Sequence, residues 1–155
     1  MNDMNGYDAE DLHPGMMATF SKTITEADIV LFAGVSGDNN AVHINEEFAA
    51  TTRFGGRIAH GFLTASVISA AVANRLPGPG TIYLSQQLNF RAPVRIGQTV
   101  HATVSVSSID RARRRVTLDT VCRVNDIVVI DGQAVVMTTS SINRSVKEAA
   151  AVAAG

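Results

Sequence analysis

The second half of the chain alternates between apolar and polar positions. From Thr81 onward, four long segments place an apolar side chain at about every second position, which is the period of a half-buried β-strand. Polar or glycine-containing turns separate the segments, which read TIYLSQQLNFRAPV, TVHATVSVSSI, RRVTLDTVCRVN and IVVIDGQAVVMTTSS. Short turns join neighbouring strands most simply as hairpins, so the pattern predicts four strands in an antiparallel meander.

The first half is predicted to hold one short strand followed by helices. Residues 17–23 alternate like a strand, and Thr25 begins a T-x-x-D sequence of the kind that opens a helix. Two glycines, Gly34 and Gly37, follow the apolar residues of this helix, where a helix would end. We expect a turn-rich loop over residues 36–45 and then a short helical stretch that starts at Glu46.

The longest apolar helical segment reads IAHGFLTASVISAAVANRL and ends before the turn sequence PGPG. It is apolar on nearly all sides, which places it inside the fold, and its small residues let strands approach closely. One strand, then helices, then four strands indicate an α+β protein. We therefore predict a hot-dog fold, a five-stranded antiparallel sheet wrapped around this long central helix.

The chain is predicted to form one domain between two terminal segments. Residues 1–16 make a polar leader, and residues 17–142 make the single hot-dog domain. Residues 143–155 combine three charged residues with an alanine-rich end, and we expect them to form a flexible tail. The same composition would also support a helical turn on a partner.

Composition and charge exclude several classes of function. Thirteen Lys and Arg residues against fourteen Asp and Glu give a net charge of -1, so no global attraction to nucleic acid or to anionic membranes is expected. No apolar run is long enough to span a membrane, and the acidic start lacks the features of a secretory signal, so we expect a cytoplasmic protein. The single cysteine, Cys122, lies in a strand pattern and is expected to be a buried structural thiol.

A carboxylate and an imidazole lie close together in the predicted loop, in the segment SGDNNAVHIN. Asp38 and His43 are five residues apart, so one loop could direct both side chains at one small volume. A carboxylate and an imidazole are suited to taking a proton from water and delivering one to carbon. Gly61, at the start of the apolar helix, could offer a free backbone N–H to a developing oxyanion.

Other interpretations of these residues stay open from spacing alone. Asp38 could merely close an Asx turn, with His43 packed beside it. A metal site formed by Asp38, His43 and His60 is conceivable, although no recognised zinc spacing is present. His60 could instead be a packing residue at the helix terminus, and His13 and His101 are expected to face solvent.

Three segments carry a resemblance to a known family. SGDNNAVH, IAHG and LPGPGTIYLSQQLNFRAPVRIGQTV resemble the MaoC-like or (R)-specific enoyl-CoA hydratase family, with similarity from about Ala18 to Ile142. The family's hydratase signature is similar to D-x-N-P-x-H, and Asp38, Asn40 and His43 fall on its Asp, Asn and His. The signature's proline is Ala41 here, so the loop loses a rigid φ angle.

The resemblance implies a function as well as a fold. It implies that two hot-dog domains pair into a homodimer or a larger homo-oligomer that takes acyl-CoA as substrate. The implied reaction is reversible syn hydration of trans-2-enoyl-CoA to (R)-3-hydroxyacyl-CoA, without a metal or redox cofactor. Asp38 and His43 then take the catalytic positions, the Gly61 N–H takes the oxyanion position, and Ser69 supplies a supporting hydroxyl.

Several alternatives to this reaction stay open. A dehydratase acting on acyl carrier protein would use the same residues, and a hot-dog domain could also bind acyl-CoA without catalysis or act as a thioesterase. The family resemblance favours short acyl chains. The pathway stays open, because precursor supply for polyester (polyhydroxyalkanoate) synthesis, fatty-acid metabolism and specialised carbon assimilation would all use this chemistry. Four arginines could contact CoA phosphates or simply be solvated, namely Arg53, Arg57, Arg91 and Arg95.

Overall fold

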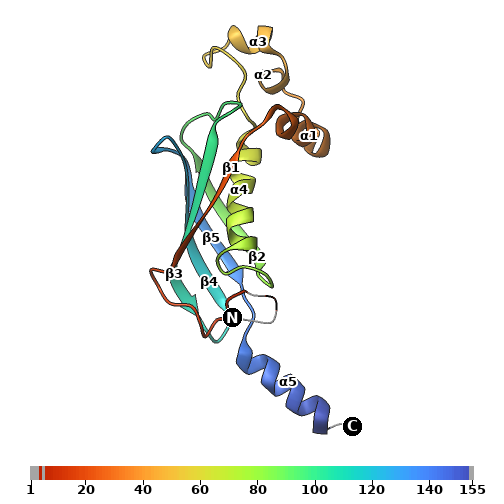
Figure 1. Cartoon of the computed structure of the whole chain (residues 1–155), viewed down its shortest axis with the longest axis vertical. Helices are drawn as coiled ribbons and strands as arrows, with labels where there is room; N and C mark the ends of the chain where they lie inside the picture. The colour runs from red at the N-terminus through yellow and green to blue at the C-terminus, as the bar shows by residue number, and fades with distance from the viewer. Residues whose placement is uncertain (1–3, 5, 154–155) are drawn as a thin grey trace.

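One curved sheet and one helix make the body of the protein (Figure 1). The structure is a computed structural model and describes residue 4 and residues 6–153; residues 1–3 and 5 of the expected leader, and 154–155 of the expected tail, lie outside the described part. The sheet has five antiparallel strands, as predicted. They are β1 (Met17–Thr23), β2 (Ile82–Phe90), β3 (Thr99–Asp110), β4 (Arg115–Val124) and β5 (Ile127–Met137).

The order of the strands differs from the predicted meander. Strands β3, β4 and β5 form a meander, but β2 pairs with β5, and β1 takes the place beside β3, so that the order is β1-β3-β4-β5-β2. Because the turns between β3 and β4 and between β4 and β5 are short, each pair of strands forms a hairpin. Asn125 and Asp126 have the positive φ angles of such a turn. The longer segment between β2 and β3, residues 91–98, lets the chain cross to the far edge. The four-strand meander was therefore wrong at β2.

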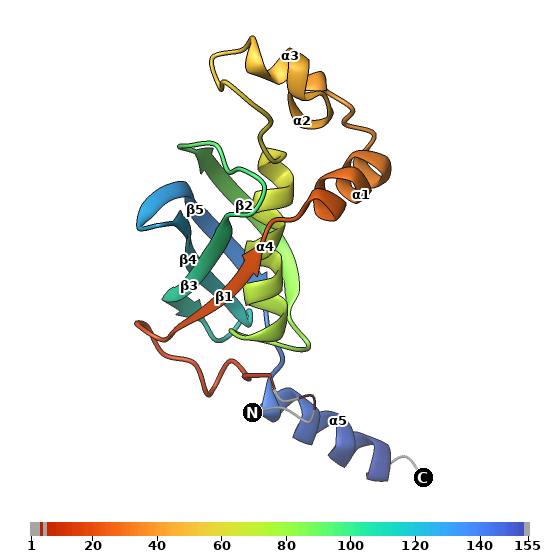
Figure 2. The ribbon, with the colours of Figure 1, turned by 45° about the horizontal axis from the view of Figure 1, so that its top comes forward.

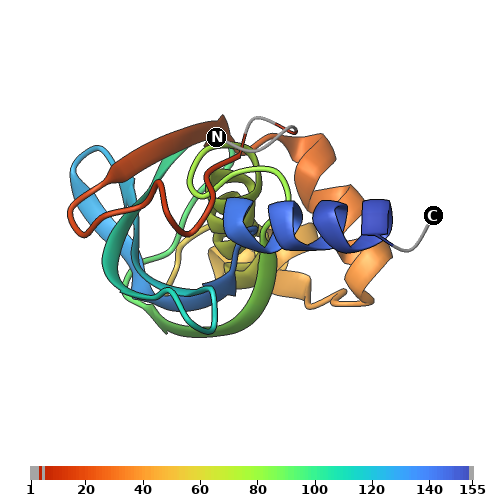
Figure 3. The ribbon, with the colours of Figure 1, turned by 90° about the horizontal axis from the view of Figure 1, so that it is seen from below.

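The predicted central helix is α4 (Gly61–Asn74), and the sheet wraps around it (Figure 2, Figure 3). Its side chains Leu63, Val67, Ile68, Ala71 and Val72 are buried in one core with residues of β3, β4 and β5. The helix begins three residues later than the apolar run because His60 has an extended backbone and forms its N-cap. None of the described helices is long and apolar enough to cross a membrane.

Three helices, within residues 26–50, lie beyond one end of the sheet (Figure 1). Helix α1 (Glu26–Ser36) starts with the predicted capping box, in which Thr25 and Asp28 satisfy each other's backbone N–H, and ends at the left-handed residue Gly37. The segment expected to be all loop contains the short helix α2 (Ala41–Ile44), because the Asn40 side chain accepts a hydrogen bond from the backbone N–H of Val42. Helix α3 (Glu46–Ala50) follows.

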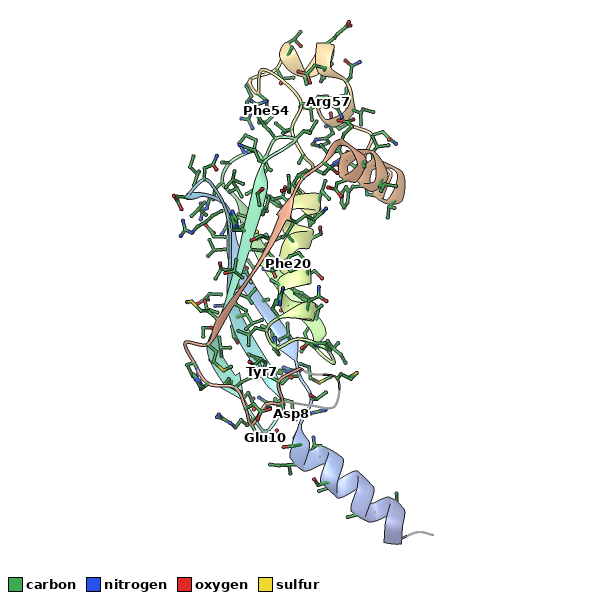
Figure 4. The ribbon with its side chains drawn as sticks, viewed as in Figure 1. Tyr7, Asp8, Glu10, Phe20, Phe54 and Arg57 are labelled. Carbon is green, nitrogen blue, oxygen red and sulfur yellow. The ribbon has the colours of Figure 1, made fainter. Side chains whose placement is uncertain are left out.

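At the opposite end of the sheet, the two terminal segments are joined by hydrogen bonds (Figure 4). The Thr138 hydroxyl donates to the backbone oxygen of Tyr7 at 2.6 Å, and the Glu10 carboxylate accepts from the hydroxyl of Ser140 and the backbone N–H of Ser141. Burial raises the pKa of Glu10, but these hydrogen bonds outweigh it and leave the pKa below its usual value. Glu10 thereby caps helix α5 (Ser141–Ala153).

The expected tail is thus helical as far as Ala153, where the sequence had favoured a flexible segment and allowed a helical turn. Alanine has the highest helix propensity, and the Glu10 cap satisfies a backbone N–H of the first turn. The leader is also partly packed, since Ala9 and Leu12 are buried. The domain limits, 17–142, stay a prediction.

Candidate active site

Asp38 lies in the loop between α1 and α2, with half of its side chain exposed. Its Oδ1 accepts a hydrogen bond from the backbone N–H of Asn40 at 3.3 Å, which is the Asx-type turn considered from the sequence. Its other oxygen, Oδ2, lies 3.9 Å from Nε2 of His43. Closing the turn and facing the imidazole are therefore compatible roles of one carboxylate.

His43 is buried on α2, and one ring nitrogen is fixed by the main chain. Its Nδ1 lies 2.8 Å from the backbone oxygen of Ile58, and a carbonyl can only accept, so Nδ1 carries a proton. Nε2 is the nitrogen that faces Asp38. At 3.9 Å the two groups make no direct hydrogen bond, but one water oxygen can lie about 2.8 Å from both of them.

Gly61 lies where two hollows meet. One hollow is lined by His43, Gly61, Thr64, Phe90 and Arg53 among others, and the second by Asp38, His60, Gly61, Phe62 and Phe32. As the first residue of α4, Gly61 has a backbone N–H that precedes the intrahelical hydrogen bonds. The positive end of the helix dipole adds to its attraction for negative charge. An oxygen bound there would lie beside the Asp38–His43 pair.

His60 completes the cluster, because its buried ring packs on the ring of His43, with centroids 3.9 Å apart and planes inclined by 31°. Ligand atoms of Asp38, His43 and His60 lie within 4.8 Å of one another, so the structure does bring together the three residues of the metal alternative. Zinc lies in the plane of each imidazole that binds it, at about 2.0–2.1 Å from the nitrogen. One nitrogen of each ring already faces a backbone oxygen, Nδ1 of His43 that of Ile58 and Nε2 of His60 that of Asp38, which leaves one nitrogen of each ring for an ion or for a proton.

Two of the expected supporting residues act differently from the catalytic pair. Asn40 is the N-cap of the helix that carries His43, so it supports the site through the backbone. Ser69 lies on the exposed face of α4, about 12 Å along the helix from Gly61, and lines neither hollow. Within one chain, the structure does not bring Ser69 to the candidate site.

Arg57 is a site residue whose role the sequence did not reveal. Its Nε donates to the backbone oxygen of His43 at 2.7 Å, and its Nη2 donates to Oε1 of Glu26 at 2.8 Å. It therefore ties α2 to α1. The sequence had suggested only a phosphate contact, because a contact between segments distant in the chain leaves no local pattern.

Of the other three arginines, Arg53 and Arg91 line the first hollow and Arg95 contacts a residue that lines it. Arg53 stacks on the ring of Phe54 at 4.9 Å and lines the hollow, and Arg95 donates to the backbone oxygen of Phe54. Arg91 also lines it and binds Asp131 through Nε at 2.6 Å, and this hydrogen bond raises the pKa of Arg91 and lowers the pKa of Asp131. The first hollow therefore has two guanidinium groups at its rim.

The remaining titratable residues named from the sequence lie away from the site. Cys122 is fully buried on β4, as predicted, and burial raises the pKa of its thiol to about 12. His13 and His101 are exposed, as predicted, and His101 shares a 2.7 Å hydrogen bond with the hydroxyl of Ser21 across β1 and β3.

Comparison with known proteins agrees with this fold. A family model described as "MaoC like domain" matches residues 12–129. An (R)-specific enoyl-CoA hydratase of Rhodospirillum rubrum is 54% identical over 128 residues, which cover 83% of this chain and 89% of that protein. A 3-hydroxybutyryl-CoA dehydratase of Methylorubrum extorquens is 52% identical over 127 residues, covering 82% of this chain and 81% of that protein.

A solved structure has the same architecture. The R-hydratase PhaJ1 from Pseudomonas aeruginosa, in its unliganded form, is 41% identical and superposes with a TM-score of 0.83 over 88% of each chain. The hot-dog fold predicted from the sequence is thereby confirmed. The match to the family model and the identity to these relatives show that this chain belongs to the MaoC-like domain family.

Proposed function

We propose that this protein is an (R)-specific enoyl-CoA hydratase, a hydro-lyase that adds water to trans-2-enoyl-CoA and gives (R)-3-hydroxyacyl-CoA. The observation that carries the proposal is the 3.9 Å separation between Asp38 Oδ2 and His43 Nε2. Gly61, the first residue of α4, lines both the hollow that contains His43 and the hollow that contains Asp38. Two relatives more than half identical to this chain are named for this reaction or its reverse on CoA thioesters.

In the proposed mechanism, one water molecule lies between Asp38 and His43. Asp38 accepts a proton from this water while its oxygen bonds to C3 of the substrate. His43, protonated on Nε2, delivers a proton to C2. A proton then passes from Asp38 to His43, which restores the starting state, so that one water is consumed and the protein is unchanged.

The Gly61 N–H is proposed to bind the thioester oxygen during this step. Negative charge grows on that oxygen as hydroxide adds to C3, and a preorganised backbone donor stabilises it more in the transition state than in the substrate. Hydration moves protons and an oxygen atom but no net electrons, so the reaction calls for no redox cofactor. We propose that it proceeds without any cofactor or metal ion.

The rim of the first hollow supports CoA as the carrier. Arg53 lines this hollow with a guanidinium group, which binds phosphate oxygens well, whereas Arg91 lines it with Nε and Nη2 already bound to Asp131. The name of the Methylorubrum relative, a 3-hydroxybutyryl-CoA dehydratase, supports a short acyl chain. A dehydratase acting on acyl carrier protein is the second candidate, and turnover measured on matched CoA and carrier-protein thioesters decides between them.

We propose that the active form is a homodimer. Strand β2 is an edge of the sheet with exposed apolar side chains such as Leu84 and Phe90, and Phe62 is exposed on the neighbouring face of α4. A second copy placed on this face would cover Ser69 as well, and so could bring its hydroxyl to a substrate. Light scattering on the purified protein tests the dimer. The cytoplasmic location and a role in polyester or fatty-acid metabolism stay predictions.

The deciding experiment follows the loss of enoyl-thioester absorbance with crotonyl-CoA and determines the configuration of the alcohol formed. We expect fast loss that gives the (R)-alcohol, and a loss of at least about 100-fold in kcat for Asp38→Asn and for His43→Asn. Near-normal turnover in either variant would refute the catalytic pair. Binding of acyl-CoA without turnover would identify a binding domain, and release of free thiol would identify a thioesterase.

A further inference from the structure

His60 joins the loop that carries Asp38 to the central helix. Its side chain is 1% exposed, and its Nε2 lies 2.9 Å from the backbone oxygen of Asp38. Because a carbonyl oxygen can only accept, Nε2 carries the proton and donates it. The other hydrogen bonds made by residues 37–39 stay within residues 33–40, as far as the described residues show. The His60 hydrogen bond therefore crosses from the loop to α4.

The ring of His60 also contacts both helices that flank the loop. It packs against the ring of His43 at 3.9 Å and against the ring of Phe32, on α1, at 5.0 Å. Its Nδ1 is buried and has no hydrogen-bond partner among the described residues. A second proton placed there would be a buried donor without an acceptor, which is costly. His60 therefore makes one hydrogen bond, through Nε2, and fills the space between α1 and α2 with its ring.

We propose, on the basis of the hydratase function above, that His60 is a positioning residue for the catalytic pair. Its Nε2–H holds the main chain of Asp38 in a position from which Oδ2 of Asp38 and Nε2 of His43 can bind the same water molecule. His43 has its own anchor in the backbone oxygen of Ile58, whereas the exposed Asp38 depends on this one bond to α4. A displacement of about 1 Å between reacting groups can cost about 100-fold in rate.

Two polar substitutions that both remove the ring test the hydrogen bond. In His60→Gln the side-chain amide nitrogen reaches the place of Nε2, whereas in His60→Asn it reaches only the place of Nδ1. We expect His60→Gln to keep kcat within about fivefold of the native value and His60→Asn to lose about 50-fold or more, with little change in KM in either. Equal kcat in the two variants, or a loss that lies mainly in KM, would overturn the proposal.

His60→Phe gives the complementary control, because it keeps a ring beside His43 and removes the donor. We expect it to be as slow as His60→Asn, and a kcat near the native value would contradict the role of the hydrogen bond. Thermal unfolding of each variant establishes that it is folded. If His60→Phe does not fold, the Gln and Asn pair still decides.

A measurement without substrate separates this inference from the proposed function. Nitrogen-15 NMR of the histidine rings, with His60 assigned from the spectrum of His60→Gln, reports which nitrogen carries the proton. We expect the Nε2–H form, with a proton that exchanges slowly with water. An Nδ1–H form or a rapidly exchanging proton would refute the anchor even in an active hydratase. Absence of turnover on any enoyl thioester would instead refute the proposed function.

Discussion

The ring of Phe90 lies directly over the backbone of Gly61. A Cβ atom added at Gly61 would be 2.8 Å from Cε1 of Phe90 and 3.1 Å from its Cδ1. Phe90 is the last residue of β2, and its ring also meets the ring of Phe62 edge to face, with centroids 5.6 Å apart. The first turn of α4 is therefore approached closely by a side chain of the sheet, and a residue with a Cβ at this position would displace the ring or the helix end.

Gly61→Ala is expected to remove activity while the protein stays folded. The new methyl group would lie 2.8 Å from Cε1 of Phe90, so either this half-exposed ring or the first turn of α4 must move. Movement of the helix end would take the Gly61 N–H away from the thioester oxygen that it is proposed to bind. Loss of one oxyanion donor typically costs about 100-fold or more in kcat, and initial rates with crotonyl-CoA measure this loss.

Gly34→Ala is the matched control for that substitution. Gly34 lies inside α1, and an added Cβ meets no atom within 4 Å. Alanine should stabilise this helix by about 0.5–1 kcal/mol and leave kcat unchanged. Native-like rates in Gly61→Ala, or equal loss in both variants, would contradict the proposed role of Gly61.

Ala41→Pro is expected to stabilise the protein and keep its activity. Ala41 is the first residue of α2, where the family signature has proline and where a helix needs no N–H from that residue. The preceding residue, Asn40, has ψ 128°, an extended value that proline tolerates before it. We expect a gain of about 0.4–1 kcal/mol in the free energy of unfolding, measured with urea.

Ala49→Pro is the matched control for proline. The Ala49 N–H donates to the backbone oxygen of Asn45 at 2.9 Å, and proline would remove this hydrogen bond. This variant should be less stable than the native protein. Destabilisation by Ala41→Pro as well would show that the loop does not accept the signature's proline.

The sequence predicted the elements well, because the signals for elements are local. The alternation of β3, β4 and β5 marks one buried face, and the Thr25–Asp28 capping box marks the start of α1. The position of β2 in the sheet was not predictable in this way. A strand shows the same alternation whichever neighbour it pairs with, so only the tertiary fold decides between β3 and β5.

The candidate site was predictable in part for the same reason. Asp38 and His43 lie in one short segment, so their proximity followed from the local sequence. The hydrogen bonds that orient them come from Arg57 and His60, which follow α3 in the sequence. Contacts between segments so far apart in the chain leave no periodic pattern. Ser69 was expected as a site residue only from the family resemblance, and within one chain it does not lie near Asp38 and His43.

Arg57→Lys should lower kcat more than it lowers stability. A lysine ammonium cannot hold both the backbone oxygen of His43 and the carboxylate of Glu26 in the planar geometry of the guanidinium group. We expect kcat to fall about tenfold and the free energy of unfolding to fall by about 1 kcal/mol. Crotonyl-CoA kinetics and urea unfolding measure the two effects.

Arg113→Lys is the control for that substitution, since Arg113 pairs with Asp110 on the exposed surface. We expect a change in stability below about 0.5 kcal/mol and no change in kcat. If Arg57→Lys behaves like this control, Arg57 does not orient His43.

Cys122 should not react with thiol reagents in the folded protein. The thiol is buried, and burial raises its pKa to about 12, so almost no thiolate is present at pH 8. We expect a chromogenic disulfide reagent to label the protein only in denaturant, with one thiol released per chain. Complete labelling within seconds under native conditions would contradict the buried position on β4.

The stability that Asp28 gives to the start of α1 should depend on pH. Burial raises the pKa of Asp28, but the Thr25 backbone N–H and the Lys22 ammonium, 3.0 Å from its Oδ1, outweigh it and lower the pKa below its ordinary value of 3.8. The pKa of Asp28 is lower in the folded state than in the unfolded state. The stabilisation is therefore complete at pH values above the ordinary pKa, and it is lost as the pH falls through the pKa of the folded state.

Asp28→Asn should therefore reduce the free energy of unfolding by about 1 kcal/mol at pH 7 and by less near pH 3. Urea unfolding of both proteins at the two pH values measures this difference. Asp110→Asn removes the charge of an exposed pair with Arg113 and keeps an amide oxygen for the Arg113 backbone N–H, so it should change stability by less than about 0.5 kcal/mol at either pH. If the loss for Asp28→Asn were equal at both pH values, the charge on Asp28 would not stabilise α1, and the capping box would act through hydrogen bonds that a neutral side chain makes equally well.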